Sequence, residues 1–271
     1  VLLTLFGAVL FFYFKGTPPA DEAVRQEPTV SMKLLPLPEG DEIQAVRIQS
    51  KAGGEEITLE KENGIWLVTR PVRYPADPLL ATGLTKALGL SSKARRLLPE
   101  GGWEQYGLDK PSVRIRVKTL KNPRWRTLTL GDRSPVGDYV YGRWKGEREY
   151  FLLAAGFQSA FERTVYSLRE KRVFRIPMRD VAAVRVKSRT GDYEFIRRDS
   201  GIWQWTEPVE LMGEEIPLPW INDFLAGIQG LFIKDFADET SSSDLGFWAG
   251  SSTLEIRDGR ERSETLRLGN E

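Results

Sequence analysis

The sequence predicts an α+β protein: two tandem copies of a mostly antiparallel β module with one main helix each, preceded by a single transmembrane helix. Three observations support this prediction. The chain opens with an uncharged apolar run, short sequence blocks recur at a nearly constant spacing, and in each half an alternating apolar pattern gives way to a helical one. A chain of 271 residues is long enough for two domains of ordinary size.

The apolar run Val1–Phe14 contains no charge and ends at Lys15. It is short for a bilayer-spanning helix, but the chain begins with Val rather than Met, so we expect that residues have been lost before it. Thr17–Pro19 is a poor signal-peptidase site, and the aromatic residues Phe11–Tyr13 beside Lys15 are typical of an interfacial belt. We therefore predict a transmembrane anchor over residues 1–15, with a buried strand or helix as the alternative.

The next segment, residues 16–40, is polar and rich in proline, which argues against a helix interior or a central strand. Such a composition favours extended conformations, so we predict a semi-rigid tether between the anchor and the folded part. Within it, only the apolar patch Met32–Leu37 is suited to local packing. The prolines are Pro18, Pro19, Pro28, Pro36 and Pro38.

Four sequence blocks recur roughly 137 residues further along the chain, which indicates a duplicated module. We place the first copy at residues 41–176 and the second at residues 177–271. The first copy continues for about forty residues beyond its last matching block, so we expect the second to be incomplete at its C-terminus. The matching blocks are Val46–Ile48 with Val184–Val186, Gly64–Trp66 with Gly201–Trp203, Tyr106–Leu108 with Leu245–Phe247, and Leu128–Asp132 with Leu266–Asn270; Pro71 and Pro208 each follow the tryptophan of their copy.

Each copy begins with alternating apolar residues, the pattern of a half-buried strand, as in Val46 and Ile48. Asn63-Gly64 is a strong signal for a two-residue hairpin turn. A helix follows, with Asp77 suited to its N-cap and Pro78 to its first position. The further strands are predicted at Ile57–Leu59, Ile65–Val68, Val113–Val117, Leu128–Leu130, Tyr139–Trp144, Glu149–Leu153, Leu254–Ile256 and Leu266–Leu268. The helical stripes are Leu80, Leu84 and Leu88, then Trp220, Ile221, Phe224, Leu225 and Ile228, with a short helix at Phe157–Phe161.

The composition excludes several kinds of active site. The chain has no Cys, which excludes disulfides, thiolate nucleophiles and Cys-ligated zinc or iron–sulfur clusters. It has no His, the commonest general base near neutral pH and the commonest transition-metal ligand. The formal net charge of +1 disfavours a general nucleic-acid binder. We predict no cofactor, no transition-metal site and no catalytic residues, although carboxylate, Lys and Tyr chemistry and oxygen-ligated calcium stay open.

One predicted strand carries cations at every second position and apolar residues between them. We expect two more cations on the neighbouring strand, giving a basic face suited to phosphate or lipid head groups. We favour an ordinary solvated face, because exposed strands are often charged to block edge pairing. The second copy has Thr253, Glu255 and Arg257 at the positions that match the first strand. The five cations of the basic face are Arg114, Arg116, Lys118, Arg124 and Arg126.

Two further sets of residues have a functional and a structural interpretation. Trp66 and Trp203 each follow Gly-Ile and could stack on a sugar or a partner, but a packing role explains why both copies carry one. Paired carboxylates could act as an acid and a base across a cleft, but we favour a surface role for them. The carboxylates are Glu55, Glu56, Glu214, Glu215, Asp235 and Asp238.

Taken together, these motifs give the chain a resemblance to a bacterial family catalogued as domain of unknown function 4340. The resemblance implies an auxiliary envelope protein of the kind often encoded beside gliding-motility-type ABC transporter components, and it carries over no catalytic residues. It rests on the N-terminal anchor, on Gly64–Trp66 with Pro71, on Gly201–Trp203 with Pro208, on Tyr106–Leu108 and on Leu130-Gly131.

We therefore expect a non-catalytic accessory or scaffold subunit of a cell-envelope complex, of the ABC exporter type that the resemblance implies. Its expected place is the bacterial inner membrane, as a single-pass protein with the folded part on the periplasmic or extracytoplasmic side. Its expected partners are integral membrane transporter subunits and, through residues 1–15, the lipid bilayer; nucleic acid is not among them. The alternative is an envelope glycan-binding protein or a carboxylate-dependent hydrolase, which a cleft with converging acids would favour.

Overall fold

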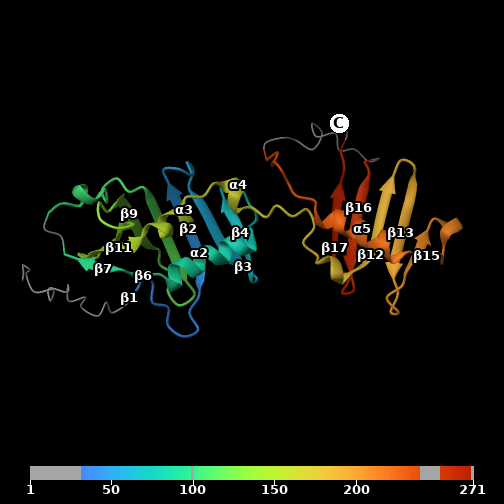
Figure 1. Ribbon diagram of the computed structural model, residues 1–271, viewed down its shortest axis with the longest axis horizontal. Coiled ribbons are helices and arrows are strands. Elements are labelled where there is room, and N and C mark those ends of the chain that lie inside the picture. The colour runs from blue at the N-terminus through green and yellow to red at the C-terminus, as the bar shows by residue number, and fades with distance from the viewer. Residues whose placement is uncertain (1–31, 99–100, 239–250, 270–271) are drawn as a thin grey trace, which may run out of the picture. The chain divides into compact units, whose positions relative to one another are not determined.

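The computed structural model describes residues 32–98, 101–238 and 251–269. The fold is mixed α/β, with mostly antiparallel sheets and few helices (Figure 1). The predicted anchor at residues 1–15 and the predicted tether up to residue 31 lie outside the described residues. Within the described ranges, no helix is both long and apolar enough to cross a membrane.

The first half of the described chain is mostly strands. They are β1 (Met32–Lys33), β2 (Ile43–Ser50), β3 (Ile57–Glu62), β4 (Ile65–Arg70), β5 (Tyr74–Pro75), β6 (Ser92–Lys93), β7 (Arg95–Leu97), β8 (Val113–Thr119), β9 (Arg126–Arg133), β10 (Tyr139–Trp144) and β11 (Tyr150–Ala154). The helices among them are α2 (Pro78–Leu90), the 3₁₀ turn η1 (Trp103–Tyr106), α3 (Ala155–Phe161) and α4 (Val165–Leu168).

The second half repeats this alternation on a smaller scale. It contains η2 (Met178–Asp180), β12 (Val181–Ser188), β13 (Gly191–Arg197), β14 (Trp203–Glu207), η3 (Val209–Leu211), β15 (Glu215–Ile216), α5 (Leu218–Gln229), β16 (Thr253–Asp258) and β17 (Ser263–Arg267). Among the described residues, one sheet has the order β5-β4-β3-β2-β8-β9-β10-β11-β7, another has the order β15-β14-β13-β12-β16-β17, and β1 pairs with β6.

Contacts between Cα atoms divide the chain into two compact units. Unit 1 comprises Val1–Ala52 and Gly83–Glu162, and unit 2 comprises Gly53–Thr82 and Arg163–Glu271. Unit 2 therefore contains β3, β4 and β5 as well as the whole of the six-stranded sheet.

The core of unit 1 lies on one face of its strands, where α3 contacts β8, β10 and β11. The alternation of buried and half-buried residues along β8 shows which face of the sheet carries this core. Val113, Ile115 and Val117 are at most 1% exposed, and the residues between them are half-buried. Because successive side chains of a strand point to opposite sides, the cations of β8 lie on the face away from α3.

The patch Met32–Leu37 packs within unit 1. Leu34 and Leu35 are almost completely buried, and the indole Nε1 of Trp144 donates a hydrogen bond of 3.2 Å to the carbonyl oxygen of Leu34. The end of the predicted tether is therefore part of the folded core, because its apolar side chains find a surface to cover.

The first hairpin of unit 2 has the predicted turn. Asn63 and Gly64 both have positive φ, 49° and 82°, as a type I′ turn requires, and Glu62 pairs with Ile65 across it. The N-cap of α2 is also confirmed: the Asp77 carboxylate accepts hydrogen bonds from the N–H groups of Leu79 and Leu80, at 2.9 and 3.0 Å.

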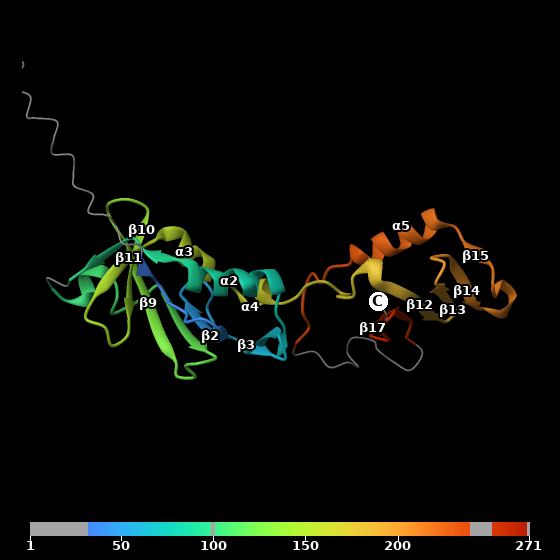
Figure 2. The ribbon, with the colours of Figure 1, turned by 90° about the horizontal axis from the view of Figure 1, so that it is seen from below.

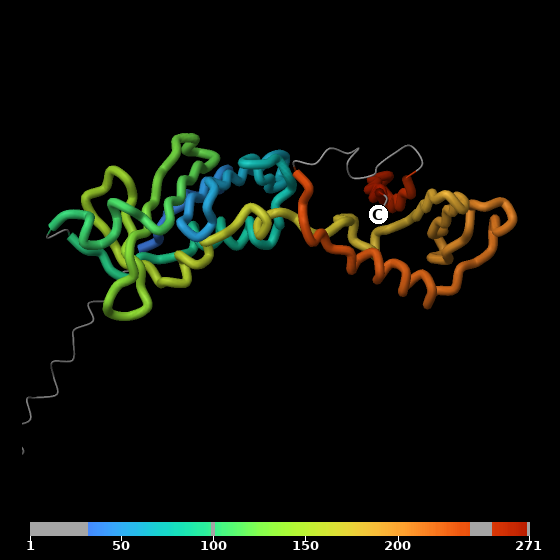
Figure 3. The backbone as a smooth tube through the Cα atoms, turned by 90° about the horizontal axis from the view of Figure 1, so that it is seen from above, coloured from blue at the N-terminus to red at the C-terminus, as the bar shows by residue number. Residues whose placement is uncertain are grey.

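The six-stranded sheet of unit 2 packs one face against α5 (Figures 2 and 3). Phe195 lies at the centre of this core, with four aromatic rings within 5.8 Å of it, centroid to centroid. The predicted apolar stripe of α5 supplies two of these rings. The buried core residues are Phe174, Ile176, Val181, Val184, Phe195, Trp203, Ile216, Ile221, Ile228 and Ile256.

The repeated sequence blocks that fall in described strands occupy corresponding places. The antiparallel pairs β2–β8, β8–β9, β3–β4 and β4–β5 have counterparts in β12–β16, β16–β17, β13–β14 and β14–β15. The register shift between Ile43 and Ala45 recurs between Val181 and Ala183. The block Leu245–Phe247 lies outside the described residues.

Candidate functional site

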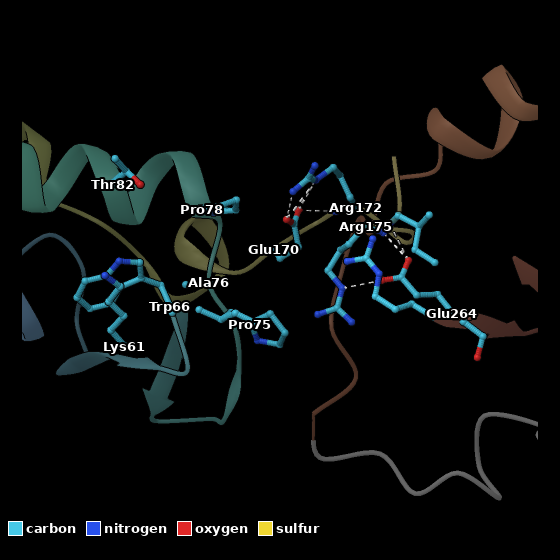
Figure 4. A pocket seen from close by; sticks show the side chains of 15 residues that line it. Lys61, Trp66, Pro75, Ala76, Pro78, Thr82, Glu170, Arg172, Arg175 and Glu264 are labelled. Carbon is cyan, nitrogen blue, oxygen red and sulfur yellow. Dashed lines mark hydrogen bonds and ion pairs between the residues drawn. The ribbon is translucent and has the colours of Figure 1, made fainter. Parts of the chain in front are cut away.

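A pocket of 690 Å³ lies in unit 2, to which all of its lining residues belong (Figure 4). The β3–β4 hairpin, β5 and the first turns of α2 form one wall, and the segment after α4 and the β16–β17 turn form the other. The first wall consists of Lys61, Gly64, Ile65, Trp66, Pro75, Ala76, Pro78 and Thr82. The second consists of Glu170, Arg172, Arg175, Ile176, Arg262, Ser263 and Glu264.

The hairpin wall is mainly apolar. Trp66 is half-buried and pairs with Lys61 across the two strands, while Ile65 at the turn is 59% exposed. The tight Asn-Gly turn holds these side chains at the end of a short hairpin. This wall offers an aromatic surface with one ammonium group beside it.

Two arginine–glutamate pairs form the polar wall (Figure 4). Glu170 is only 5% exposed and accepts hydrogen bonds from the Arg172 side chain, the shortest at 2.6 Å, and from its backbone N–H at 2.9 Å. Glu264 accepts hydrogen bonds from the backbone N–H groups of Arg175 and Ile176, at 2.6 and 3.1 Å, and from Arg175 Nε at 3.2 Å. Both carboxylates of the pocket are therefore occupied by donors.

Burial is the strongest single influence on Glu170 and raises the pKa of its carboxyl, but the hydrogen bonds and charge of Arg172 together outweigh it, so that pKa lies below its usual value. The hydrogen bond with Glu170 in turn raises the pKa of Arg172. A carboxylate held ionised in this way has no proton to donate near neutral pH. The arrangement is suited to binding rather than to general acid catalysis.

The pocket as a whole favours an anionic or amphipathic ligand. Four of its lining residues are cations and two are carboxylates. The described residues contain no group of three or more His, Cys, Asp or Glu side chains that could hold a metal ion.

Arg169, near this pocket in sequence, has the most enclosed ion pair of unit 2 that the described residues show. It is 3% exposed, and its guanidinium lies 4.4 Å from the ring centroid of Tyr74 and 3.5 Å from that of Phe236. Both terminal nitrogens bond the carboxylate of Asp238, with Nη2 to Oδ1 at 2.7 Å. The hydrogen bond from Arg169 is the main reason why the pKa of Asp238 is lowered. We call these four residues the Arg169 clasp.

The backbone on both sides of Arg169 fixes its position. The Asp77 N–H donates to the carbonyl oxygen of Leu168 at 2.8 Å, and the Glu170 N–H donates to that of Pro75 at 2.9 Å. The clasp therefore ties the segment that follows α5 to β5 and to the start of α2. Aromatic faces and a bidentate carboxylate make a favourable site for a guanidinium.

The predicted carboxylate candidates have other roles or stand at the surface. Asp238 belongs to the clasp, and Asp235 accepts a hydrogen bond of 2.8 Å from the Phe236 N–H. Glu214 and Glu215 are exposed at β15, as is Glu55 in the β2–β3 connection, where Glu56 is half-buried.

The predicted basic face is only partly assembled. Arg114, Arg116 and Lys118 share the face of β8 that lies away from α3. Arg126 stands opposite the buried Val117, so it points to the other face, where its guanidinium lies 4.4 Å from the ring centroid of Trp144. Arg124 is exposed ahead of β9. The prediction that Arg124 and Arg126 complete the face was wrong. Arg124 precedes β9, which begins at Arg126, and the pairing of β9 with β8 places Arg126 on the other face.

Two other arginines join the face instead. Arg47 of β2 lies directly opposite Arg116, and Arg143 of β10 lies opposite Thr129, which itself faces Arg114. The position of neither arginine can be predicted from the periodicity of one strand, because the register between neighbouring strands decides it. Arg169 was missed for a similar reason: its partners Tyr74 and Phe236 are far from it in the sequence.

The two tryptophans occupy corresponding strand positions but differ in burial. Trp203 is 3% exposed and belongs to the core of the six-stranded sheet, which confirms its predicted packing role. Trp66 is half-buried and lines the pocket.

Comparison with known proteins gives one family. The family described as Domain of unknown function (DUF4340) matches residues 66–249, which is more than half of the chain. No curated protein and no solved structure matches. The chain therefore belongs to the DUF4340 family, as its motifs predict.

Proposed function

We propose that this chain is a non-catalytic accessory or scaffold subunit of a cell-envelope complex of the ABC exporter type, built from two copies of one α+β module. A single transmembrane helix at residues 1–15 anchors it, and the modules lie on the extracytoplasmic side. The proposal combines the apolar N-terminal run, the Pro-rich segment after it and the family membership.

The observation that carries the proposal is a pair of pockets that share five corresponding lining residues. In the second module a pocket of 390 Å³ lies where the β13–β14 hairpin meets α5. Five of its lining residues correspond by strand register or helix position to residues that line the pocket of 690 Å³. The corresponding pairs are Lys61 with Arg197, Gly64 with Gly201, Trp66 with Trp203, Pro78 with Leu218, and Thr82 with Asn222.

Each pocket has a cation, a turn glycine and a tryptophan among these corresponding residues. In the first pocket the carboxylates are paired with arginines, and the second is lined by Arg179 and Arg197 and by apolar side chains such as Met178 and Leu225. Grooves with an apolar floor and charged margins are typical of sites that bind polypeptide segments. This supports a role in assembly.

The test is purification of the full chain from native membranes in mild detergent, followed by mass spectrometry. We expect stable recovery of integral transporter subunits, with an interface above the roughly 1,000 Å² of a biological contact. Deleting residues 1–15 should weaken the association, because the anchor brings the partners together in one membrane. Recovery of a lone monomer under gentle conditions would contradict the proposal.

One observation favours the alternative function, an envelope glycan-binding protein or a carboxylate-dependent hydrolase. Trp66 is half-buried at a pocket large enough for a small ligand, and aromatic faces stack on sugar rings. Polymer binding by the wild type and by Trp66→Ala distinguishes the two functions. A glycan binder is retained on an envelope polymer as wild type and loses this retention in Trp66→Ala. An accessory subunit does not bind the polymer even as wild type, whether or not the variant keeps its transporter partners.

A further inference from the structure

The pocket of 390 Å³ is lined by two arginines and, among the described residues of its lining, by no carboxylate. Arg179 comes from η2 and Arg197 from the end of β13. The pocket of 690 Å³ differs in this respect, because each arginine of its lining pairs with a carboxylate. We call the smaller one the Arg197 pocket.

The guanidinium of Arg197 is held in place without a countercharge. Its Nη1 donates a hydrogen bond of 3.0 Å to the carbonyl oxygen of Arg179, and its centre lies 6.0 Å from the ring centroid of Trp203, its cross-strand neighbour. The described residues provide no ion pair for Arg197 and no hydrogen-bond acceptor for its Nε or Nη2. One nitrogen therefore positions the group, and two can donate to a ligand.

The charge of Arg179 is only weakly compensated. Arg179 Nε lies 3.6 Å from Asp180, and the two side chains are 84% and 46% exposed. An exposed pair of this kind contributes little to stability, so a ligand can replace the partner. Neither Asp180 nor Asp223 of α5 lines the pocket. Arg179 and Arg197 together are therefore suited to a carboxylate, which a guanidinium binds with two parallel donors.

The rest of the Arg197 pocket is mainly apolar. Trp203 and Ile221 are 3% and 1% exposed, whereas Leu218 at the start of α5 is 58% exposed. Asn222 and Gln229, both exposed on α5, add two amide groups. An exposed leucine beside a buried apolar surface favours contact with apolar side chains of a ligand. The volume lies in the range of about 300–1,000 Å³ that is usual for ligand sites.

We propose that the Arg197 pocket binds an acidic side chain of a partner polypeptide, flanked by apolar residues of the same segment. This inference rests on the proposed function for the class of occupant and adds the chemistry that selects it. The carboxylate accepts hydrogen bonds from Arg197 and Arg179, and the apolar neighbours contact Leu218. Charge complementarity favours an acidic segment, because a neutral or basic one leaves the positioned guanidinium of Arg197 without a countercharge.

Two peptides that differ in one charge test this inference. They are acetyl-Ala-Leu-Glu-Leu-Ala-amide and the same peptide with Gln in place of Glu. Each is titrated into the full chain in phosphatidylcholine nanodiscs and followed by calorimetry, with empty nanodiscs as the blank. We expect the Glu peptide to bind about tenfold more tightly than the Gln peptide, because hydrogen bonds to a charged group contribute more than those to a neutral amide.

Variants then identify the side chains. Arg197→Gln should remove the preference for the Glu peptide and leave the affinity for the Gln peptide unchanged. Arg198→Gln is the matched control and should change neither affinity, because Arg198 does not line the pocket and its Nε bonds Gln204 Oε1 at 2.9 Å. Leu218→Gln should weaken both peptides equally, since it removes only an apolar contact. Should circular dichroism show that Arg197→Gln does not fold, Arg197→Lys serves instead and should reduce the preference, because lysine keeps the charge but not the paired donors.

Three results would overturn the inference: equal affinity of the wild type for the two peptides, equal losses in Arg197→Gln and Arg198→Gln, or tighter binding of octanoate than of the Glu peptide, which would indicate a fatty acid as the occupant. Co-purification of the wild type with transporter subunits is measured in parallel. Co-purification without a preference for the Glu peptide rejects only this inference, whereas the preference without any transporter subunit rejects only the accessory role.

Discussion

At the scale of single residues, unit 2 depends on how its arginines are paired. Arg169 is almost fully buried and has a carboxylate and two aromatic rings around its guanidinium. A buried charge that loses its partner costs far more than an exposed pair contributes. The clasp should therefore be sensitive to changes that hardly alter its shape.

Asp238→Asn tests this at nearly constant volume. It leaves the guanidinium without a countercharge, so the free energy of unfolding should fall by about 2 kcal/mol near pH 7, less than for a fully buried pair because Asp238 is partly exposed. The native pKa of Asp238 is depressed, so its contribution is present above the unfolded-state pKa and is lost as the pH falls through the native value. Urea unfolding at about pH 7 and pH 3 should show the wild type and variant converging at acid pH.

Asp235→Asn is the matched control for this change, because the Asp235 carboxylate bonds the backbone N–H of Phe236 and not the guanidinium. It should cost less than Asp238→Asn at about pH 7. A stability difference between wild type and Asp238→Asn that does not shrink at low pH would contradict the ionic role of the clasp.

At the scale of elements, the β3–β4 and β13–β14 hairpins each have a turn that needs a left-handed glycine. Gly64 and Gly201 have the same φ of 82°, and an added Cβ would meet no atom within 4 Å at either position. The glycines are therefore required for backbone conformation and not for space. Gly83 in α2 and Gly227 in α5 differ from these glycines in backbone conformation. A Cβ would meet nothing within 4 Å at either position, but their φ is ordinary.

These glycines predict opposite signs for the same substitution. Gly64→Ala and Gly201→Ala should each lower the free energy of unfolding by about 1–2 kcal/mol, the cost of a left-handed residue with a Cβ. Gly83→Ala and Gly227→Ala should each raise it by about 0.5–1 kcal/mol, because alanine is the better helix former. Thermal unfolding of the four variants measures this. A stabilised Gly64→Ala would show that the turn differs from type I′.

At the scale of the whole molecule, positive and negative charges nearly cancel, and the net charge is +1. Part of this balance is local on the sheet of β12 and β16, where Arg185 pairs with Glu207 at 3.1 Å and Arg257 pairs with Glu194 at 3.4 Å.

The composition of the whole chain also predicts its metal content. With neither Cys nor His, the full-length chain should bind no zinc, iron or copper at stoichiometric levels. Elemental analysis of the purified protein, with a dialysis buffer blank, measures this. One equivalent of any of these three metals would contradict the prediction, whereas calcium would not, because oxygen ligands are plentiful.

The sequence alone was sufficient for features that depend on neighbours along the chain. The Asn63-Gly64 turn, the Asp77 cap and the alternation of β8 were all predicted correctly, since each follows from local sterics, hydrogen bonding or period. The spacing of repeated blocks predicted two copies of one module, and in the structure β12 pairs with β16 as β2 pairs with β8. Local rules of this kind act before any tertiary contact forms.

The tertiary structure decided what depends on register and on distant contacts. It placed Arg126 on the core face, brought Arg47 and Arg143 to the cations of β8, and enclosed Arg169 between Tyr74 and Phe236. A shift of one residue in strand pairing moves a side chain to the other face, and ring contacts across long sequence separations leave no periodic signal. The sequence by itself therefore determined the family and the local turn, cap and strand alternation, while the composition of each surface was determined only when the strands were aligned.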